Sequence, residues 1–267
     1  MARVLVLRTG QAVNRVHAHC GPFYRLFERA LNARATDPVE VDELDVTCRR
    51  AGDAMPPLER YHGAIMTGSP AFVGDDEPWM RFGEEVLLHL LARDIPLLCV
   101  CFGHQLLGLA LESDVGPNPR GREMGTIDVV VDAPEDPLLG HLPKRFEAQC
   151  THRDVIVNAS GRVRVLGSAA HDGCHVVRAG PRAWGLQFHP EFDDVIMRLY
   201  LEVRREVLDL ELGPGSCDRR IARVRPTPEA ASILPRFADL CRAEARARAN
   251  ARAHGGHADS DGDAHGA

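Results

Sequence analysis

The fold class of this 267-residue chain is decided by the stretch Leu97-Leu98-Cys99-Val100-Cys101-Phe102-Gly103-His104-Gln105. Residues 96–100 form a short apolar run, which is typical of a strand buried on both faces. A helical pattern starts directly afterwards, at residues 102–111. Cys101 therefore stands at a sharp strand-to-helix turn, where Gly103 allows the close backbone approach that such a turn needs. This turn predicts a cysteine side chain exposed above the edge of a sheet.

Outward from this stretch, strand-like and helix-like segments alternate. Short strands are expected at residues 3–7, 39–44 and 63–66, and helices at residues 22–33 and 78–93. Such alternation predicts an α/β fold with a parallel sheet. Later strand-like runs follow one another through short turns and predict antiparallel additions; they lie at residues 126–131, 155–158, 163–166, 175–178 and 183–188. A further helix is expected at residues 193–208.

The chain divides into three regions by composition. Residues 1–210 contain the alternating pattern and are expected to form one catalytic domain. Residues 211–252 begin with a connector rich in Gly, Pro and Arg and continue as an Ala- and Arg-rich helix. Residues 253–267 are mostly Gly, His, Asp and Ala, which predicts a disordered tail because they offer too little apolar surface to pack.

Charge and cysteine usage limit the classes of function. The formal net charge is −6, with 32 basic and 38 acidic residues, so a nucleic-acid partner is not expected. No apolar run reaches the roughly 18 residues of a membrane span, and the start lacks a signal-peptide pattern, so we expect a cytoplasmic protein without membrane contact. The eight cysteines are scattered, which predicts reduced thiols; no second ligand pair accompanies Cys99 and Cys101, so no metal site is expected.

Cys101 has two interpretations from its local sequence. A helix N-terminus beside the sulfur favours the thiolate form, and its free N–H groups can hold an oxyanion, which suits a nucleophile. The alternative is a small buried apolar side chain, the common role of a free cysteine.

A second segment supplies the partners that a cysteine nucleophile needs. Trp184-Gly185-Leu186-Gln187-Phe188-His189-Pro190-Glu191-Phe192 is an apolar strand that ends in His-Pro-Glu. His189 and Glu191 are two positions apart, so in extended backbone their side chains point the same way. A carboxylate there can fix the imidazole tautomer while His189 serves as base. The alternative is a surface histidine with a solvated Glu191.

Together these motifs resemble the class I glutamine amidotransferase family, and more narrowly its stand-alone domains similar to the glutaminase half of GMP synthase. The resemblance covers roughly residues 3–205. It includes four further motifs: Thr67-Gly68-Ser69-Pro70, Asp75-Asp76-Glu77-Pro78-Trp79, Arg122-Glu123-Met124-Gly125 and Thr151-His152-Arg153-Asp154. It implies a flavodoxin-like sandwich with a mostly parallel central sheet and the site at the carboxyl ends of the strands.

The resemblance also implies roles for particular residues. Cys101 attacks the side-chain amide of glutamine, His189 moves the proton and Glu191 orients His189; no cofactor or metal is needed. The backbone N–H groups of Gly68 and Phe102 would form the oxyanion hole. The glutamine pocket would be surrounded by Gln105, Glu123, Gly125, Thr151 and His152.

Some features depart from the family pattern or carry no motif. Cys99 stands where the family usually has glycine, and its thiol could compete with Cys101 in oxidation. Thr151 stands where the family often has serine. His104 is expected to pack or to donate a hydrogen bond, because a helical side chain there would have to reach back to serve as base. His171 and His175 belong to no motif and are expected to be ordinary.

Three functions remain open at this stage. The first is hydrolysis of glutamine to glutamate and ammonia, with the ammonia passed to a separate synthase, since the sequence has no Gly-x-x-x-x-Gly-Lys-Ser loop for ATP. The second is hydrolysis of another γ-glutamyl compound, such as a γ-glutamyl peptide, by the same three residues. The third is a catalytically silent binding or regulatory module.

Overall fold

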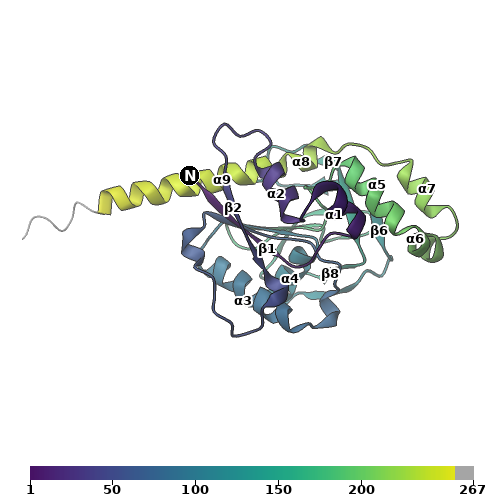
Figure 1. Cartoon of the computed structure of the whole chain (residues 1–267), viewed down its shortest axis with the longest axis horizontal. Helices are drawn as coiled ribbons and strands as arrows, with labels where there is room; N and C mark the ends of the chain where they lie inside the picture. The colour runs from purple at the N-terminus through teal and green to yellow at the C-terminus, as the bar shows by residue number, and fades with distance from the viewer. Residues whose placement is uncertain (256–267) are drawn as a thin grey trace, which may run out of the picture.

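A twisted sheet runs through the centre of the molecule in the computed structural model, which describes residues 1–255 (Figure 1). Within these residues the sheet has nine strands in the order β2-β1-β3-β4-β11-β10-β9-β6-β7. A separate two-stranded sheet pairs β5 (Asp114–Pro117) with β8 (Asp154–Asn158).

The first half of the large sheet is parallel. Its strands are β1 (Arg3–Arg8), β2 (Glu40–Asp45), β3 (Gly63–Met66), β4 (Leu97–Val100) and β11 (Ala183–Leu186). All four pairings between them are parallel. In the pairing of β4 with β11, Leu97 lies opposite Ala183. Because β4 and β11 are parallel neighbours, the residues that follow them meet at the same edge of the sheet.

The second half of the sheet is antiparallel. It consists of β6 (Glu123–Val131), β7 (Arg145–His152), β9 (Arg164–Ala169) and β10 (Val176–Arg178). These strands are joined to β11 and to one another by antiparallel pairings. The predicted α/β fold, with its parallel central sheet and antiparallel additions, is confirmed.

Alternation within β1 shows why helices cover both faces of the sheet. Val4 and Val6 are buried in one hydrophobic core, whereas Leu5 and Leu7 are buried in the other. Successive side chains of a strand point to opposite faces, so an entirely apolar strand needs cover on both sides.

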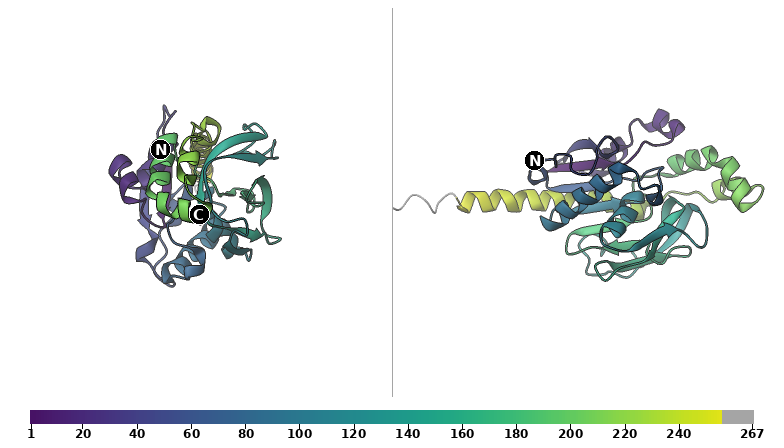
Figure 2. Two further views of the ribbon diagram at one scale, coloured as in Figure 1. Left: turned by 90° about the vertical axis from the view of Figure 1, so that its right-hand side faces the viewer. Right: turned by 90° about the horizontal axis from the view of Figure 1, so that it is seen from below.

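The helices supply that cover, as Figure 2 shows from two sides. One core is filled by side chains of α1 (Asn14–Cys20), α2 (Tyr24–Leu31), α5 (Asp194–Val203), α8 (Pro228–Ala231) and α9 (Ile233–Gly255). The other is filled by α3 (Pro78–Ala92) and α4 (Phe102–Ala110). Helices α6 (Arg205–Leu212) and α7 (Ser216–Ile221) pack beside α5. Short 3₁₀ turns occur at Val46–Cys48, Leu58–Arg60 and Val73–Asp75.

The segment after residue 210 packs on the same core as the sheet. Phe237 and Cys241 of α9 are fully buried, and the Cys241 sulfur would lie 2.2 Å from a Cβ placed on Gly63. Beyond these contacts α9 continues past the end of the sheet (Figure 1). The helix reaches Gly255, so residues 253–255 are helical, not tail; residues 256–267 lie outside the described residues.

Several element boundaries differ from those expected. The helix expected at residues 22–33 is preceded by α1, which ends where Gly21 takes φ 80°. The helix expected at residues 193–208 breaks at Arg204 into α5 and α6. Strands β5 and β7 had no counterpart among the expected segments. The four residues of β5 are too few to show a pattern, whereas Phe146, Ala148 and Cys150 of β7 do alternate with polar residues, so β7 was missed although its signal was present. Among the described residues, no helix is both long and apolar enough to cross a bilayer.

Candidate active site

Cys101 lies on the one-residue turn between β4 and α4. Its backbone has φ 52° and ψ −104°, a region that is costly for a residue with a Cβ. The Cys101 N–H donates to the carbonyl of Leu186 at 2.7 Å, which ties the turn to the end of β11. A side chain at Gly103 would lie 2.6 Å from the carbonyl oxygen of Met66, so only glycine fits there. The turn predicted from the sequence is present, but the Cys101 side chain is buried at the bottom of a pocket and not exposed as expected, because the surrounding loops cover the sheet edge.

His189 and Glu191 follow β11 at the same sheet edge. The His189 N–H donates to the Gln149 carbonyl at 2.8 Å, which fixes the backbone after the strand. The Nδ1 of His189 lies 2.7 Å from Oε1 of Glu191, and both side chains are almost fully buried. This contact makes Nδ1 the donor, and Nε2 is the ring nitrogen that remains unpaired among the described residues.

The environment of His189 favours its charged form. Burial alone would lower the pKa of His189, but the Glu191 carboxylate and the Cys101 sulfur outweigh burial and raise the pKa to about 10. The imidazolium is therefore the stable partner for a sulfur anion at neutral pH.

Cys101 and His189 meet beside Gly68. A Cβ placed on Gly68 would lie 3.0 Å from Cε1 of His189 and 3.9 Å from Sγ of Cys101. The thiol faces the Thr151 carbonyl at 3.7 Å, and Nε2 of His189 is buried without a hydrogen-bond partner in the described part of the chain. Nε2 therefore lies where a proton can pass between it and the neighbouring thiol.

Two backbone N–H groups are available for an oxyanion. Gly68 follows β3 and Phe102 opens α4, and neither N–H donates a hydrogen bond within residues 1–255. Both residues line the pocket above Cys101. The N-terminus of α4 adds a partial positive charge beside these two groups.

The predicted substrate residues fall into two groups. Gln105, Thr151 and His152 line the pocket, and Gln105 Nε2 donates to the Asp154 carbonyl at 2.7 Å. Glu123 and Gly125 do not line this pocket among the described residues. Glu123 instead contacts Nε2 of His152 from behind, with its Oε2 at 3.1 Å. Burial opposes ionisation of Glu123, but the His152 hydrogen bond together with the charges of His175, His152 and His171 outweighs burial and lowers the pKa of the carboxyl.

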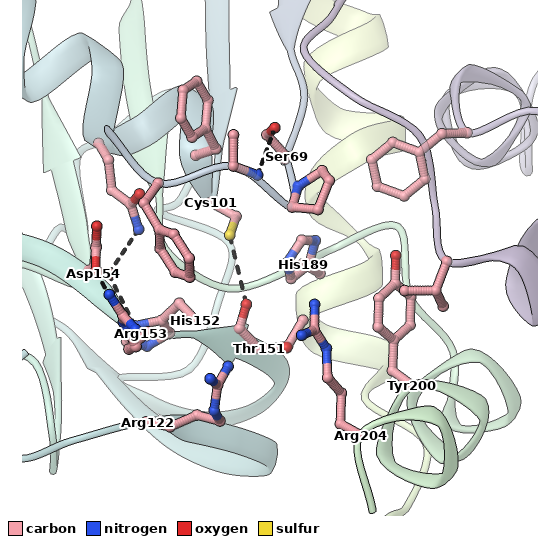
Figure 3. A pocket seen from close by; sticks show the side chains of 18 of the residues that line it. Ser69, Cys101, Arg122, Thr151, His152, Arg153, Asp154, His189, Tyr200 and Arg204 are labelled. Carbon is pink, nitrogen blue, oxygen red and sulfur yellow. Dashed lines mark hydrogen bonds and ion pairs between the residues drawn. The ribbon is translucent and has the colours of Figure 1, made fainter. Parts of the chain in front are cut away.

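Three arginines around the pocket were not expected from the sequence. Arg122, Arg153 and Arg204 all line it, and Figure 3 shows their guanidinium groups below Cys101 and His189. Arg122 is paired with Glu211 at 2.8 Å, and Arg153 lies over the ring of Phe72. Arg122 and Arg153 belong to two of the motifs quoted from the sequence, but no role in the pocket was expected for them. Arg204 belongs to no motif.

His104 and Cys99 are buried away from the pocket. His104 is fully buried, and its Nδ1 would be 2.6 Å from a Cβ on Gly185; burial lowers the pKa of His104 to about 4. A neutral ring in that position is a packing group, in line with the expectation. Cys99 is also fully buried, and burial strongly raises the pKa of its thiol. Its side chain is accommodated where glycine was expected, and it is a poor competitor for Cys101 in oxidation chemistry.

A cysteine on a strained turn, a buried histidine–carboxylate pair and free N–H groups at the carboxyl ends of parallel strands are typical of a cysteine-dependent acyl-transfer site. The glutamine amidotransferase class-I family model matches residues 25–196. The chain belongs to the class I glutamine amidotransferase family, as its motifs predicted.

Curated relatives cover only parts of the chain. A glutamine-hydrolysing GMP synthase from Aeropyrum pernix is 31% identical over 158 residues, which are 59% of this chain and 28% of that synthase. One subunit of the glutamine-hydrolysing GMP synthase of Ignicoccus hospitalis is 34% identical over 98 residues, which are 36% of this chain and 50% of that subunit. Gamma-glutamyl peptidase 3 of Arabidopsis thaliana is 24% identical over 160 residues, 58% of this chain and 63% of the peptidase. The chain thus spans less than two thirds of each.

Solved structures confirm the fold over a longer stretch. A glutamine amidotransferase from Thermotoga maritima superposes with a TM-score of 0.64 and 18% identity, covering 90% of this chain and 97% of that one. A protein of the GMP synthase subunit type from Thermoplasma acidophilum gives 0.63 and 17% identity, covering 93% and 98%. At such identities the similarity concerns the fold.

Proposed function

We propose that the chain hydrolyses the γ-amide of glutamine to glutamate and ammonia, with Cys101, His189 and Glu191 as the catalytic residues. The observation that carries this proposal is the free Nε2 of His189 beside Cys101, with Nδ1 held by Glu191 at 2.7 Å. Family membership gives the reaction class, and the geometry supports the proposed roles.

In the first half of the reaction, Nε2 of His189 takes the thiol proton and the Cys101 sulfur attacks the amide carbon. The oxyanion that forms is held by the N–H groups of Gly68 and Phe102. The C–N bond then breaks as His189 returns the proton to the leaving nitrogen, which departs as ammonia. A γ-glutamyl thioester on Cys101 remains.

In the second half, water enters and His189 takes one of its protons. The resulting hydroxide attacks the thioester carbon, and the C–S bond breaks to release glutamate and the Cys101 thiolate, which recovers its proton from His189. Glu191 stays ionised throughout and stabilises the imidazolium that forms in both halves.

The test compares wild type with Cys101→Ala. Cys48→Ala is the matched control, because Cys48 is exposed and lies far from Cys101 in the sequence. Ammonia and glutamate release from glutamine should be lost in Cys101→Ala and kept in Cys48→Ala. Equal release by the Cys101 variant would reject the mechanism. If the wild type is silent with all γ-glutamyl compounds and a glutamine-like electrophile fails to label Cys101, a binding or regulatory module becomes the better interpretation.

A second substrate class is favoured by Arg204. Its guanidinium lines the pocket and forms no hydrogen bond or ion pair within the described part of the chain. A γ-glutamyl peptide carries a carboxylate on its leaving amine, whereas the leaving group of glutamine is ammonia. An unpaired arginine near the nucleophile suits that extra carboxylate. The relationship to gamma-glutamyl peptidase 3 points the same way.

Arg204→Met keeps an unbranched apolar stem and removes the guanidinium charge. For γ-glutamyl peptide hydrolysis we expect kcat/KM for a γ-glutamyl dipeptide to fall about tenfold or more, the scale of one charge-assisted contact. The value for glutamine should change far less. A uniform change for both substrates would count against recognition of the leaving group by Arg204.

If glutamine is the substrate, we propose that the ammonia passes to a separate synthase protein. This rests on relatives that are GMP synthases, one of them a single subunit of such an enzyme. Glutaminase activity would then rise when the partner docks. Activity unchanged across a titration with the candidate synthase would reject dependence on that partner.

A further inference from the structure

A second cluster of titratable side chains lies behind the pocket, on the antiparallel half of the sheet. It contains Glu123, Cys150, His152, Asp172 and His175, all buried. Glu123 opens β6, Cys150 and His152 end β7, and Asp172 and His175 precede β10. Buried charges in such number need pairing or a bound ion.

The donor atoms of this cluster converge. The donor atoms of Glu123, Cys150 and His152 lie within 4.8 Å of one another, and the same holds for His152, Asp172 and His175. Oε2 of Glu123 is 3.1 Å from Nε2 of His152. Two ligand atoms bound to one tetrahedral ion at about 2.0 Å are about 3.3 Å apart.

The surroundings orient these side chains in the way metal ligands are oriented. Nδ1 of His152 contacts the Asp154 carbonyl at 3.1 Å, which directs Nε2 toward Glu123. The Cys174 N–H donates to Oδ1 of Asp172 at 2.8 Å, which leaves Oδ2 on the side of His175. Outer hydrogen bonds of this kind fix the tautomer and direction of ligating groups.

One ring nitrogen of the cluster is unpaired. Nε2 of His175 is buried and has no hydrogen-bond partner in the part of the chain that the structure describes. The His175 ring is fully buried between His152 and Phe188, with 5.8 Å between ring centroids on each side. An unpaired buried ring nitrogen is costly, and a bound ion would remove that cost.

We propose that Glu123, Cys150, His152 and His175 bind one divalent transition-metal ion of the zinc class, with Nε2 of His175 as its ligand atom and Asp172 holding Nδ1 of the same ring. The mixture of imidazole, thiol and carboxylate donors suits zinc and not magnesium or calcium, which prefer oxygen alone. The ion would join β6, β7 and the loop before β10, and so hold the Thr151–His152 wall of the pocket in place. Its role is structural, so the proposal stands apart from the glutaminase chemistry.

The experiment measures binding of Zn²⁺ and Co²⁺ to the full, untagged, chelator-treated chain. A Cys101→Ser background removes the nucleophile as a ligand, and glutamine replaces His254, His257 and His265 so that tail histidines do not bind. We expect one ion per chain after desalting, a visible Co²⁺ spectrum of a tetrahedral site, and a higher Tm with Zn²⁺.

Three further variants locate the ion. His175→Gln and Glu123→Gln should each weaken Zn²⁺ binding about tenfold or more, whereas His141→Gln, the same change at an exposed histidine, should have no effect. Cys150→Ser is nearly isosteric and should remove the near-ultraviolet sulfur-to-cobalt band even if the larger changes disturb folding. No binding in the parent, or binding that none of the cluster variants alters, would overturn the proposal.

Discussion

The imidazole of His189 lies parallel to the phenyl ring of Phe192, with 4.1 Å between the ring centroids and 9° between the planes. Phe192 in turn stacks on Tyr200, a residue of α5 that lines the pocket. The imidazole is therefore held by Glu191 at one ring edge and by Phe192 across one face. If His189 is the base, as proposed above, Phe192 positions it.

Phe192→Leu should lower kcat about tenfold with little change in KM, because the imidazole loses the face that keeps it in line with the thiol. The substitution conserves an apolar side chain, so the free energy of unfolding should fall by only about 1–2 kcal/mol. The matched control is Phe27→Leu, a fully buried phenylalanine of α2, which should cost similar stability and leave kcat alone. Equal kcat in the two variants would contradict the positioning role.

The raised pKa of His189 predicts how stability depends on pH. Below about pH 6.5 the imidazole is protonated in both folded and unfolded chains. From there to the folded pKa of about 10, the folded chain holds a proton that the unfolded chain lacks. The free energy of unfolding contributed by His189 should therefore fall as pH rises through this window, by up to about 1.4 kcal/mol per pH unit.

Urea unfolding of wild type and His189→Gln at several pH values measures this contribution as the difference between the two profiles. Glu191→Gln should flatten the profile in the same window, because the carboxylate that raises the pKa is gone. Parallel profiles for wild type and His189→Gln would show that His189 gains no proton affinity on folding.

Gly68→Ala should reduce kcat about 10²-fold, the usual cost of disturbing an oxyanion donor. The new methyl group would lie 3.0 Å from Cε1 of His189, so the imidazole would have to shift, whereas its 3.5 Å distance from Cβ of Cys101 is an ordinary contact. Gly74→Ala is the control, because a Cβ there has nothing within 4 Å. Steady-state kinetics with circular dichroism would separate a local effect from misfolding, and an unimpaired Gly68→Ala enzyme would remove Gly68 from the site.

Thiol labelling should single out Cys101 among the buried cysteines. Burial raises the pKa of the thiols of Cys99, Cys150 and Cys241, so these should resist iodoacetamide in the native protein and react after unfolding. Cys101 lines the pocket and should react in the native state, as should the exposed Cys48. Peptide mass mapping gives the sites. Labelling of Cys99 before Cys101 in the native protein would contradict this arrangement, because it would mean that solvent reaches Cys99 and not Cys101.

The sequence was sufficient where chemistry is local to one motif. The turn at Cys101 and the His189–Glu191 pair could be predicted because strand, nucleophile and helix follow one another, and because i and i+2 share a side in extended backbone. The alternation of apolar strands and helices in the first half identified the parallel sheet for the same reason.

Features assembled from distant segments could not be predicted. Arg204 reaches the pocket only because the helix after β11 breaks there into α5 and α6. His175 has no motif, yet the β10–β11 pairing brings its ring beside His152 in the interior. Glu123 was expected at the substrate and lies behind His152 instead, because β6 and β7 pair with these two residues opposite each other. Such placements depend on sheet register, which no single segment determines.

The insertion of β11 between β4 and β10 has a consequence for how the enzyme would refold. Cys101 follows β4 and His189 follows β11. The whole antiparallel half of the sheet is synthesised between these two residues. Closing such a long loop is slow compared with forming the local β–α turns of the N-terminal half. Recovery of activity after dilution from denaturant should therefore lag behind recovery of helical signal, and the return of turnover would time the moment at which the last central strand docks.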